Sequence, residues 1–337
     1  MEESCPESQN AAMRYAMTGA TGFLGGELAR QLLSSGHDVA ALVRDPLKAT
    51  SLRDRGAVLV VGDLDDAAAL DRLLTDADGF FHVAGWYKLG RREHPTLRRV
   101  NVTGTRNALE AAKRSGVPRT VYTSSTAIYS DTRGATRDET YRHPGPWVSE
   151  YDRTKAEAHQ VAEEFAAADL PLVIVQPSVI YGPGDTGSGL GQLTRDVIAG
   201  RPVLGPKGGG CSWTHVEDAA RGHVLAMEKG RLGESYILAG EQALYGDVFH
   251  QVKALAGREG RITLLPPGPM KVMAALVAQV ERVVRIPQTM TAEAARAATA
   301  TYYGDSTKAR TELAWTSRPL HEGMAETVRA ELDGEST

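Results

Sequence analysis

The first half of the chain alternates short apolar runs with longer stretches of helical periodicity. The apolar runs are 39–43, 57–61, 80–84, 120–125 and 172–176, and the helical stretches are 66–74, 101–115 and 151–167. Strands separated by helices of this length predict an α/β fold with a doubly wound parallel sheet of the Rossmann type. Because ligands bind at the carboxyl ends of the strands in such sheets, the residues after each strand are the first candidates for a site.

A glycine-rich turn joins the first expected strand and helix within residues 13–45. It contains Gly19, Gly22 and Gly25 and leads into a helical pattern. In a dinucleotide site such glycines allow a tight turn, a close approach of the backbone to the pyrophosphate and close packing of helix on strand. The helix N-terminus also offers free N–H groups to phosphates. We therefore favour a cofactor-binding turn over a purely structural one.

The pattern changes after residue 176. Glycine- and proline-rich loops are followed by a strand-to-helix pattern and then by mostly helical sequence. We predict a dinucleotide-binding domain of residues 13–176, to which 211–240 return, and a smaller, mostly helical substrate-binding domain of 177–210 and 241–331. The apolar stretch 270–286 carries four charged residues, which favours a packed amphipathic helix over a membrane anchor.

Charge and cysteine content narrow the class of protein. The 337 residues have a formal net charge of −4, which gives no electrostatic reason to expect nucleic acid or an anionic membrane as partner. Cys5 and Cys211 cannot form a disulfide framework, which is typical of a reducing compartment. The acidic leader 1–12 has no apolar core, so we expect a disordered tail, a cytoplasmic protein and no membrane insertion. A homodimer is one option for its oligomeric state.

Tyr151 and Lys155 lie four residues apart near the start of an expected helix, so both side chains project from one face. An ammonium group one turn away is expected to favour the phenolate and to lower the pKa of the tyrosine, which makes proton exchange easier. Ser124 and Ser125 end the expected strand at 120–125, where a substrate carbonyl would lie. Asn101 begins an expected helix, where its ordinary role would be that of an N-cap.

Other side chains carry weaker signals. Cys211, His215 and His223 match no usual zinc spacing, and we expect no metal site. Aromatic residues follow strand ends or lie in loops, and several together suggest an apolar or aromatic substrate surface. The expected substrate contacts are Trp86, Thr126, Tyr181 and Trp213.

Several motifs occur together in a fixed order. They are TGATGFLGG, the Asp63-Leu64 pair, NVTGTRN, TSSTAIY, YDRTK, QPSVIYGPGD and HVEDAARGH. In this order and spacing the chain resembles the extended short-chain dehydrogenases/reductases, also called the NAD-dependent epimerase/dehydratase family, over residues 13–331. VRDP at 43–46 and the FHVAG strand are most similar to the dihydroflavonol-reductase branch.

The resemblance implies a role for each matching position. Tyr151 would be the general acid for a carbonyl oxygen, and Lys155 would hold the nicotinamide ribose and tune the tyrosine. Ser125 would hydrogen-bond the carbonyl, with Ser124 as the alternative, and Asn101 would position a water or the local backbone. Besides the tyrosine and the lysine, the implied cofactor contacts are Gly19, Thr21, Gly22, Phe23, Leu24, Gly25, Asp63, Leu64, Ala84, Pro177 and Val179.

The expected function is that of an NAD(P)-dependent oxidoreductase acting on a small ketone, aldehyde or alcohol. Arg44 follows the second expected strand, where an acidic residue would favour NAD, so we predict NADP(H), with NAD as the other option. A sugar epimerase and a catalytically silent dinucleotide-binding regulator are the alternatives. Thr126 and Ala127 cannot act as acid or base, which argues against dehydration.

Cys211 bears on the choice between reductase and epimerase. Relatives that act on nucleotide sugars commonly have an arginine five residues before the valine of the HV-x-D motif, where it binds the diphosphate. In this chain that position is Cys211. An uncharged thiol cannot make a bidentate phosphate contact. We therefore expect a substrate without a nucleotide, such as a hydrophobic or aromatic carbonyl compound.

Overall fold

The computed structural model describes residues 11–334, so most of the expected tail at 1–12 lies outside the described residues. A seven-stranded parallel sheet forms the larger part of the molecule, with strand order β3-β2-β1-β4-β5-β6-β10. Its strands are β1 (Arg14–Thr18), β2 (Asp38–Val43), β3 (Val58–Val61), β4 (Gly79–His82), β5 (Thr120–Thr123), β6 (Leu172–Pro177) and β10 (Ser235–Leu238). The strand order reverses between β1 and β4, which is the point where ligands bind in doubly wound sheets.

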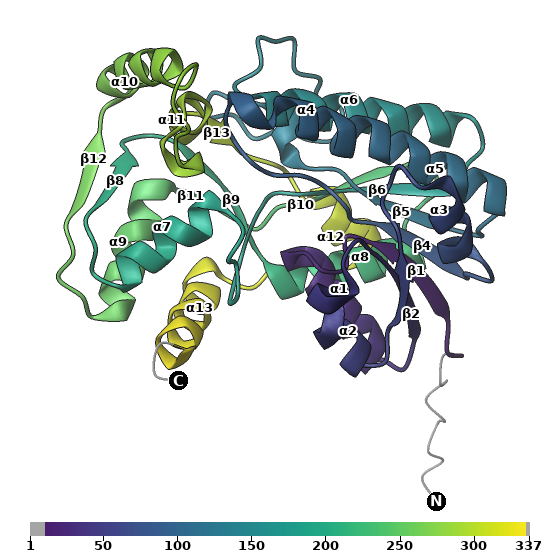
Figure 1. Ribbon diagram of the computed structural model, residues 1–337. Helices are drawn as coiled ribbons and strands as arrows, with labels where there is room; N and C mark the ends of the chain where they lie inside the picture. The colour runs from purple at the N-terminus through teal and green to yellow at the C-terminus, as the bar shows by residue number, and fades with distance from the viewer. Residues whose placement is uncertain (1–10, 335–337) are drawn as a thin grey trace, which may run out of the picture.

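Helices cover both faces of this sheet (Figure 1). One face packs against α1 (Phe23–Ser34), α2 (Thr50–Asp54), α8 (Val216–Lys229) and α12 (Thr307–Leu313). The other packs against α3 (Ala67–Leu74), α5 (Gly104–Ser115) and α6 (Glu150–Ala167), with the short α4 (His94–Leu97) beside α6. Leu24, Leu28 and Leu32 of α1 are buried, as their spacing predicts. The expected doubly wound fold is therefore confirmed.

The smaller part combines two small sheets with helices. Its four-stranded sheet contains β7 (Val179–Tyr181), β9 (Gly210–His215), β11 (Glu241–Leu244) and β13 (Thr301–Tyr302), and β8 (Val203–Pro206) pairs with β12 (Ile262–Leu265). Its helices are α7 (Gly189–Ile198), α9 (Tyr245–Ala256), α10 (Pro267–Val280), α11 (Ala292–Thr299) and α13 (Leu320–Gly334). A separate buried cluster that includes Trp213, Phe249 and Met324 forms its core.

Two of the predicted domain boundaries need correction. Residues 211–240 do not all return to the large sheet, because β9 pairs with β7, β11 and β13 in the smaller part. Conversely, α12 and Trp315 pack in the core of the larger part, although both lie within 241–331. Apolar runs predict strands, but the partner of a strand is set by contacts between residues distant in sequence.

The segment around Asn101 is a continuous helical turn rather than the start of a helix. Residues Arg98–Thr103 form a π-helical segment between α4 and α5. Asn101 is therefore inside a helical stretch and is not an N-cap, which corrects that expectation. π-Helical turns within longer helices are frequent at functional sites.

The stretch 270–286 is less buried than predicted. Of α10, which spans Pro267–Val280, only Met270 and Ala274 are buried. Within residues 11–334 no helix combines the length and the apolar character that crossing a membrane requires.

Candidate active site

The glycine turn brings the backbones after β1 and β4 into close approach. Gly19 has φ +76°, and a Cβ atom there would lie 2.6 Å from the backbone nitrogen of Ala84. No side chain fits in this cradle, so glycine is required at position 19. Gly22 is the N-cap residue of α1, and no side chain there accepts a hydrogen bond from the first turn of the helix. The free N–H groups of the first turn, at the reversal of strand order, fit a dinucleotide pyrophosphate.

Buried polar contacts fix the ends of β1 and β4 beside this turn. The Thr18 hydroxyl lies 2.7 Å from Nδ1 of His82 and accepts a hydrogen bond from the Ala84 backbone nitrogen at 3.3 Å. His82 also contacts Thr105 Oγ1 at 3.2 Å and stacks on Tyr122. Burial lowers the pKa of His82 to about 3, so the ring is neutral and positions the turn without adding charge.

Tyr151 and Ser125 lie together at the carboxyl end of β5. Ser125 follows this strand and caps a short 3-10 helix, Thr126–Tyr129, by accepting a hydrogen bond from Ala127 N. Burial raises the pKa of Tyr151 to about 12, and a hydrogen bond with Ser125 opposes part of this rise. Tyr151 therefore keeps its phenolic proton at neutral pH. Ser124 points elsewhere, because its Oγ bonds His159 Nδ1 at 2.9 Å.

Lys155 does not act on Tyr151 as predicted. Its Nζ donates to the Thr123 carbonyl at 2.9 Å and lies 5.3 Å from the centre of the Tyr122 ring. Burial lowers the pKa of Lys155 to about 7, and Lys155 is not among the groups that shift the pKa of Tyr151. The expectation of a lowered tyrosine pKa is therefore wrong, because desolvation of the phenolate dominates.

Asn101 holds the segment that leads to the site. Its side-chain Oδ1 accepts from Trp86 N at 2.7 Å, and its Nδ2 donates to Trp86 O at 3.1 Å and to Thr154 Oγ1 at 3.2 Å. Tyr87 follows Trp86, and its ring centre lies 4.7 Å from that of Tyr151 in an edge-on arrangement. Asn101 thus holds backbone in place, which is one of the two roles expected for it.

The other expected cofactor positions surround the carboxyl edge of the sheet. Arg44 is exposed directly after β2, and Asp63 is half-buried and pairs with Arg99 at 3.4 Å. Leu64 is buried against Gly104. Among the rest, Thr21 is exposed, Phe23, Ala84 and Val179 are half-buried, and Leu24, Gly25 and Pro177 are buried.

Two expected substrate contacts are core residues instead. Trp213 is 1% exposed and packs between Tyr181 and Tyr245, and Thr126 is 2% exposed. Both expectations are corrected. An aromatic residue near a strand end can face the core of the smaller part as easily as a ligand, and Thr126 is buried in the 3-10 helix that follows β5. Trp86 is half-buried, with its indole nitrogen bonded to Glu93 at 2.9 Å.

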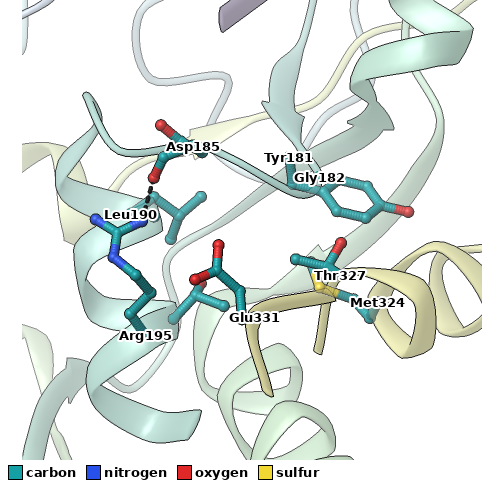
Figure 2. A pocket seen from close by; sticks show the side chains of 10 residues that line it. Tyr181, Gly182, Asp185, Leu190, Arg195, Met324, Thr327 and Glu331 are labelled. Carbon is teal, nitrogen blue, oxygen red and sulfur yellow. Dashed lines mark hydrogen bonds between the residues drawn. The ribbon is translucent and has the colours of Figure 1, made fainter. Parts of the chain in front are cut away.

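Tyr181 lines a separate pocket (Figure 2). The pocket lies between the loop after β7, α7 and α13, and Arg195 there donates to the Asp185 carbonyl. Neither Ser125, Tyr151 nor Lys155 lines it. This pocket is therefore separate from the pair formed by Ser125 and Tyr151 at the end of β5. Within residues 11–334, no group of three or more His, Cys, Asp or Glu side chains could hold a metal ion.

Sequence reasoning missed a buried carboxylate next to the tyrosine. Asp152 accepts hydrogen bonds from Ser149 at 2.9 Å, Ser130 at 3.0 Å and Tyr302 at 3.2 Å. Burial raises its pKa to about 7. These bonds join the start of α6 to β13 of the smaller part. The sequence offers only local signals, which are the position of Asp152 beside Tyr151 and three residues after Ser149, since Ser130 and Tyr302 are distant along the chain.

Comparisons with known proteins identify the family of the chain. A family model described as the NAD dependent epimerase/dehydratase family matches residues 15–239, and the chain belongs to this family. A Synechocystis protein named provisionally as a dihydroflavonol 4-reductase is 35% identical, over 72% of each chain. A Stigmatella aurantiaca ketoreductase of a 4-farnesyl-dihydroquinoline-1-oxide is 33% identical, over 67% of this chain and 68% of that protein. The solved structure of gox2253 is 32% identical with a TM-score of 0.80, over 96% of this chain and 98% of that one.

Proposed function

We propose that the protein is an NAD(P)-dependent oxidoreductase that reduces a ketone or aldehyde, or oxidises the corresponding alcohol. The observation that carries the proposal is the meeting of Ser125, Tyr151 and Lys155 at the carboxyl end of β5. The glycine turn after β1 supplies a cradle for the cofactor at the same sheet edge. Two of the relatives above are named as reductases, which supports the proposed oxidoreductase activity.

The chain's own residues would handle the carbonyl oxygen. A reduced nicotinamide, when bound, supplies the hydride that reaches the carbonyl carbon. Tyr151 is protonated at neutral pH and gives its phenolic proton to the oxygen, while the Ser125 hydroxyl donates a hydrogen bond to it. Lys155 has a pKa of about 7 and uses only one of its donors on Thr123, so it can hold the ribose and return a proton to the tyrosine.

An epimerase that oxidises and re-reduces a sugar is the alternative within the same family. A nucleotide-sugar substrate needs a cation for its diphosphate, and position 211 offers a fully buried thiol beside Tyr245. Lys207 is exposed at the end of β8, and Arg195 donates a hydrogen bond to the Asp185 carbonyl. These placements support a substrate without a diphosphate, and the Tyr87 ring beside Tyr151 favours an apolar or aromatic one.

The test is a screen of ketones and aldehydes against the purified protein, with NADPH oxidation as readout. With any substrate found, Tyr151→Phe should lower kcat about 10²- to 10⁴-fold because it removes the proton donor and little volume. The cofactor Kd should be nearly unchanged. Tyr141→Phe is the matched control, because this half-buried ring packs on Tyr129 outside the site. Near-normal turnover of Tyr151→Phe would contradict the assignment.

A further inference from the structure

Helix α10 exposes an apolar stripe instead of burying it. Val272 is 62% exposed, Leu276 is 65% exposed and Val283 is 82% exposed. Together with Val280 and Val284 these residues form what we call the α10 stripe. The opposite side of the helix packs on α11 through Met270 and Ala274. In Figure 1 α10 lies at the outer edge of the smaller part, with α11 on its inner side.

The stripe is continuous because hydrogen-bonded turns extend α10 beyond Val280. Glu281 N donates to Val277 O at 2.9 Å, and Val284 N donates to Val280 O at 2.9 Å. Residues 272, 276 and 280 follow each other at four-residue spacing, and 283 is eleven residues after 272, which is about three helical turns. These exposed side chains therefore lie on one side of α10 and of the turns that extend it.

Positive charges flank the stripe. Lys271, Arg282 and Arg285 come from α10 and the turns that follow it, and Arg91 and Arg92 come from the segment across a shallow hollow. Among residues 11–334, the Lys271, Arg91, Arg282 and Arg285 side chains make no hydrogen bond or ion pair, and Arg92 reaches only the Val283 carbonyl at 3.5 Å.

Negative charge beside the stripe is held inward. The Glu281 carboxylate accepts a hydrogen bond from Ala292 N at 3.3 Å, and Glu93 bonds the Trp86 indole. The local surface is thus apolar and cationic, although the whole chain carries a formal charge of −4. A partner for it should be apolar in the middle and anionic at the rim.

We propose that the α10 stripe docks on the surface of an anionic lipid bilayer. A helix with an apolar face flanked by Lys and Arg lies in the interface, with its apolar side chains among the acyl chains and its cations at the headgroups. A second copy of this chain fits less well, because two copies of the same stripe would bring unpaired arginines together.

The surface is joined to the candidate active site. The hollow beside the stripe is lined by Leu89, Gly90 and Thr291, among others, and residue 89 is two positions after Tyr87. Tyr87 packs on Tyr151. Docking here would therefore place the lipid surface beside the segment that borders the catalytic tyrosine. The inference does not depend on the proposed reductase activity, because its readout is binding.

The experiment measures sedimentation of the full chain with vesicles of phosphatidylcholine alone or of equal parts phosphatidylcholine and phosphatidylglycerol. We expect binding to the anionic vesicles that weakens when salt is raised to about 0.5 M. R282Q/R285Q should lower the partition coefficient by about fivefold for each arginine. V272S/L276S/V283S should lower it by more than about tenfold.

Matched controls change the same residue types elsewhere on the surface. L47S/L232S replaces two exposed leucines and R55Q/K229Q replaces two exposed cations, and both should bind as the wild type does. Thermal melts establish that each variant is folded. Equal binding by the stripe variant, or no preference for anionic vesicles, overturns the proposal. A dimer that the stripe variant abolishes, without vesicle binding, would identify a second copy as the occupant and also overturn it.

Discussion

Arg44 is exposed at the carboxyl end of β2, the position that faces the adenosine ribose in doubly wound dinucleotide sites. Its planar guanidinium suits a 2′-phosphate. Arg44→Ala should therefore weaken NADP(H) binding by about tenfold or more, the effect of losing a charge-assisted hydrogen bond, and leave NAD(H) binding nearly unchanged. Calorimetric titration of both cofactors measures this. Arg55→Ala is the control, and tighter binding of NADH by the wild type would contradict the role.

At the same scale, the sequence predicts which side chains come together better than it predicts their pKa values. The Ser125, Tyr151 and Lys155 side chains lie near the end of β5, where their motifs place them. The pKa of Tyr151 rises instead of falling, because burial and the direction of the lysine toward Thr123 depend on the three-dimensional surroundings. Asp152 was missed for the same reason, since Ser130 and Tyr302 meet it only in the folded chain.

Among the elements, α11 holds the segment that borders the site. Its Glu293 is buried and accepts hydrogen bonds from Gly90 N at 2.8 Å and from Glu150 N at 3.1 Å, and it contacts His94 Nε2 at 2.9 Å. The bond with Glu293 raises the pKa of His94 above 6.5. The stabilisation from this pair is present just below pH 6.5 and is lost as the pH rises through the raised pKa of His94. It is lost again in acid, when Glu293, whose pKa is lowered, becomes protonated.

His94→Gln should therefore lower the free energy of unfolding most near pH 6 and least near pH 8. A single group titrates over about two pH units, so the effect should change within this range. Denaturant unfolding at several pH values measures the difference between wild type and variant. His321→Gln is the control, since this exposed histidine contacts only Glu322 at 3.9 Å. A difference that stays constant from acid to neutral pH would mean that the charge of His94 does not contribute.

The periodicity of the chain predicted most of the elements, but not all of their environments. The strands of the large sheet follow apolar runs, and both helical layers follow the expected spacing. The segment that contains Trp213 is predicted to be a strand and forms β9. The sequence does not predict its partners, because β11 and β13 come from distant segments. In the same way, an apolar helix pattern predicts that α10 forms and does not reveal that its apolar side is left uncovered.

For the molecule as a whole, Arg318 links the two parts. It donates to Asp218 at 3.1 Å and Glu217 at 2.7 Å, both on α8, and to Glu326 of α13 at 2.7 Å. Asp218 is 1% exposed, and its carboxylate pairs with Arg318 and Arg221. Arg318→Met should cost on the order of 3 kcal/mol in the free energy of unfolding, because it leaves a buried carboxylate with one partner fewer.

Urea unfolding provides the measurement, and Arg231→Met provides the comparison. Arg231 pairs with Glu312 at 2.7 Å on the surface, where solvent screens the pair, so its loss should cost clearly less than the loss of Arg318. Equal losses in the two variants would show that burial of Asp218 does not determine the cost.

The path of the chain between the two parts limits how they can move. It leaves the large sheet after β6, returns at α8, leaves again after β10, returns at α12 and ends in α13. Two bodies joined by one linker can swing about a hinge, whereas bodies joined by several parallel tethers cannot separate without straining all of them. A single proteolytic cut at any one crossing should therefore leave the two parts associated.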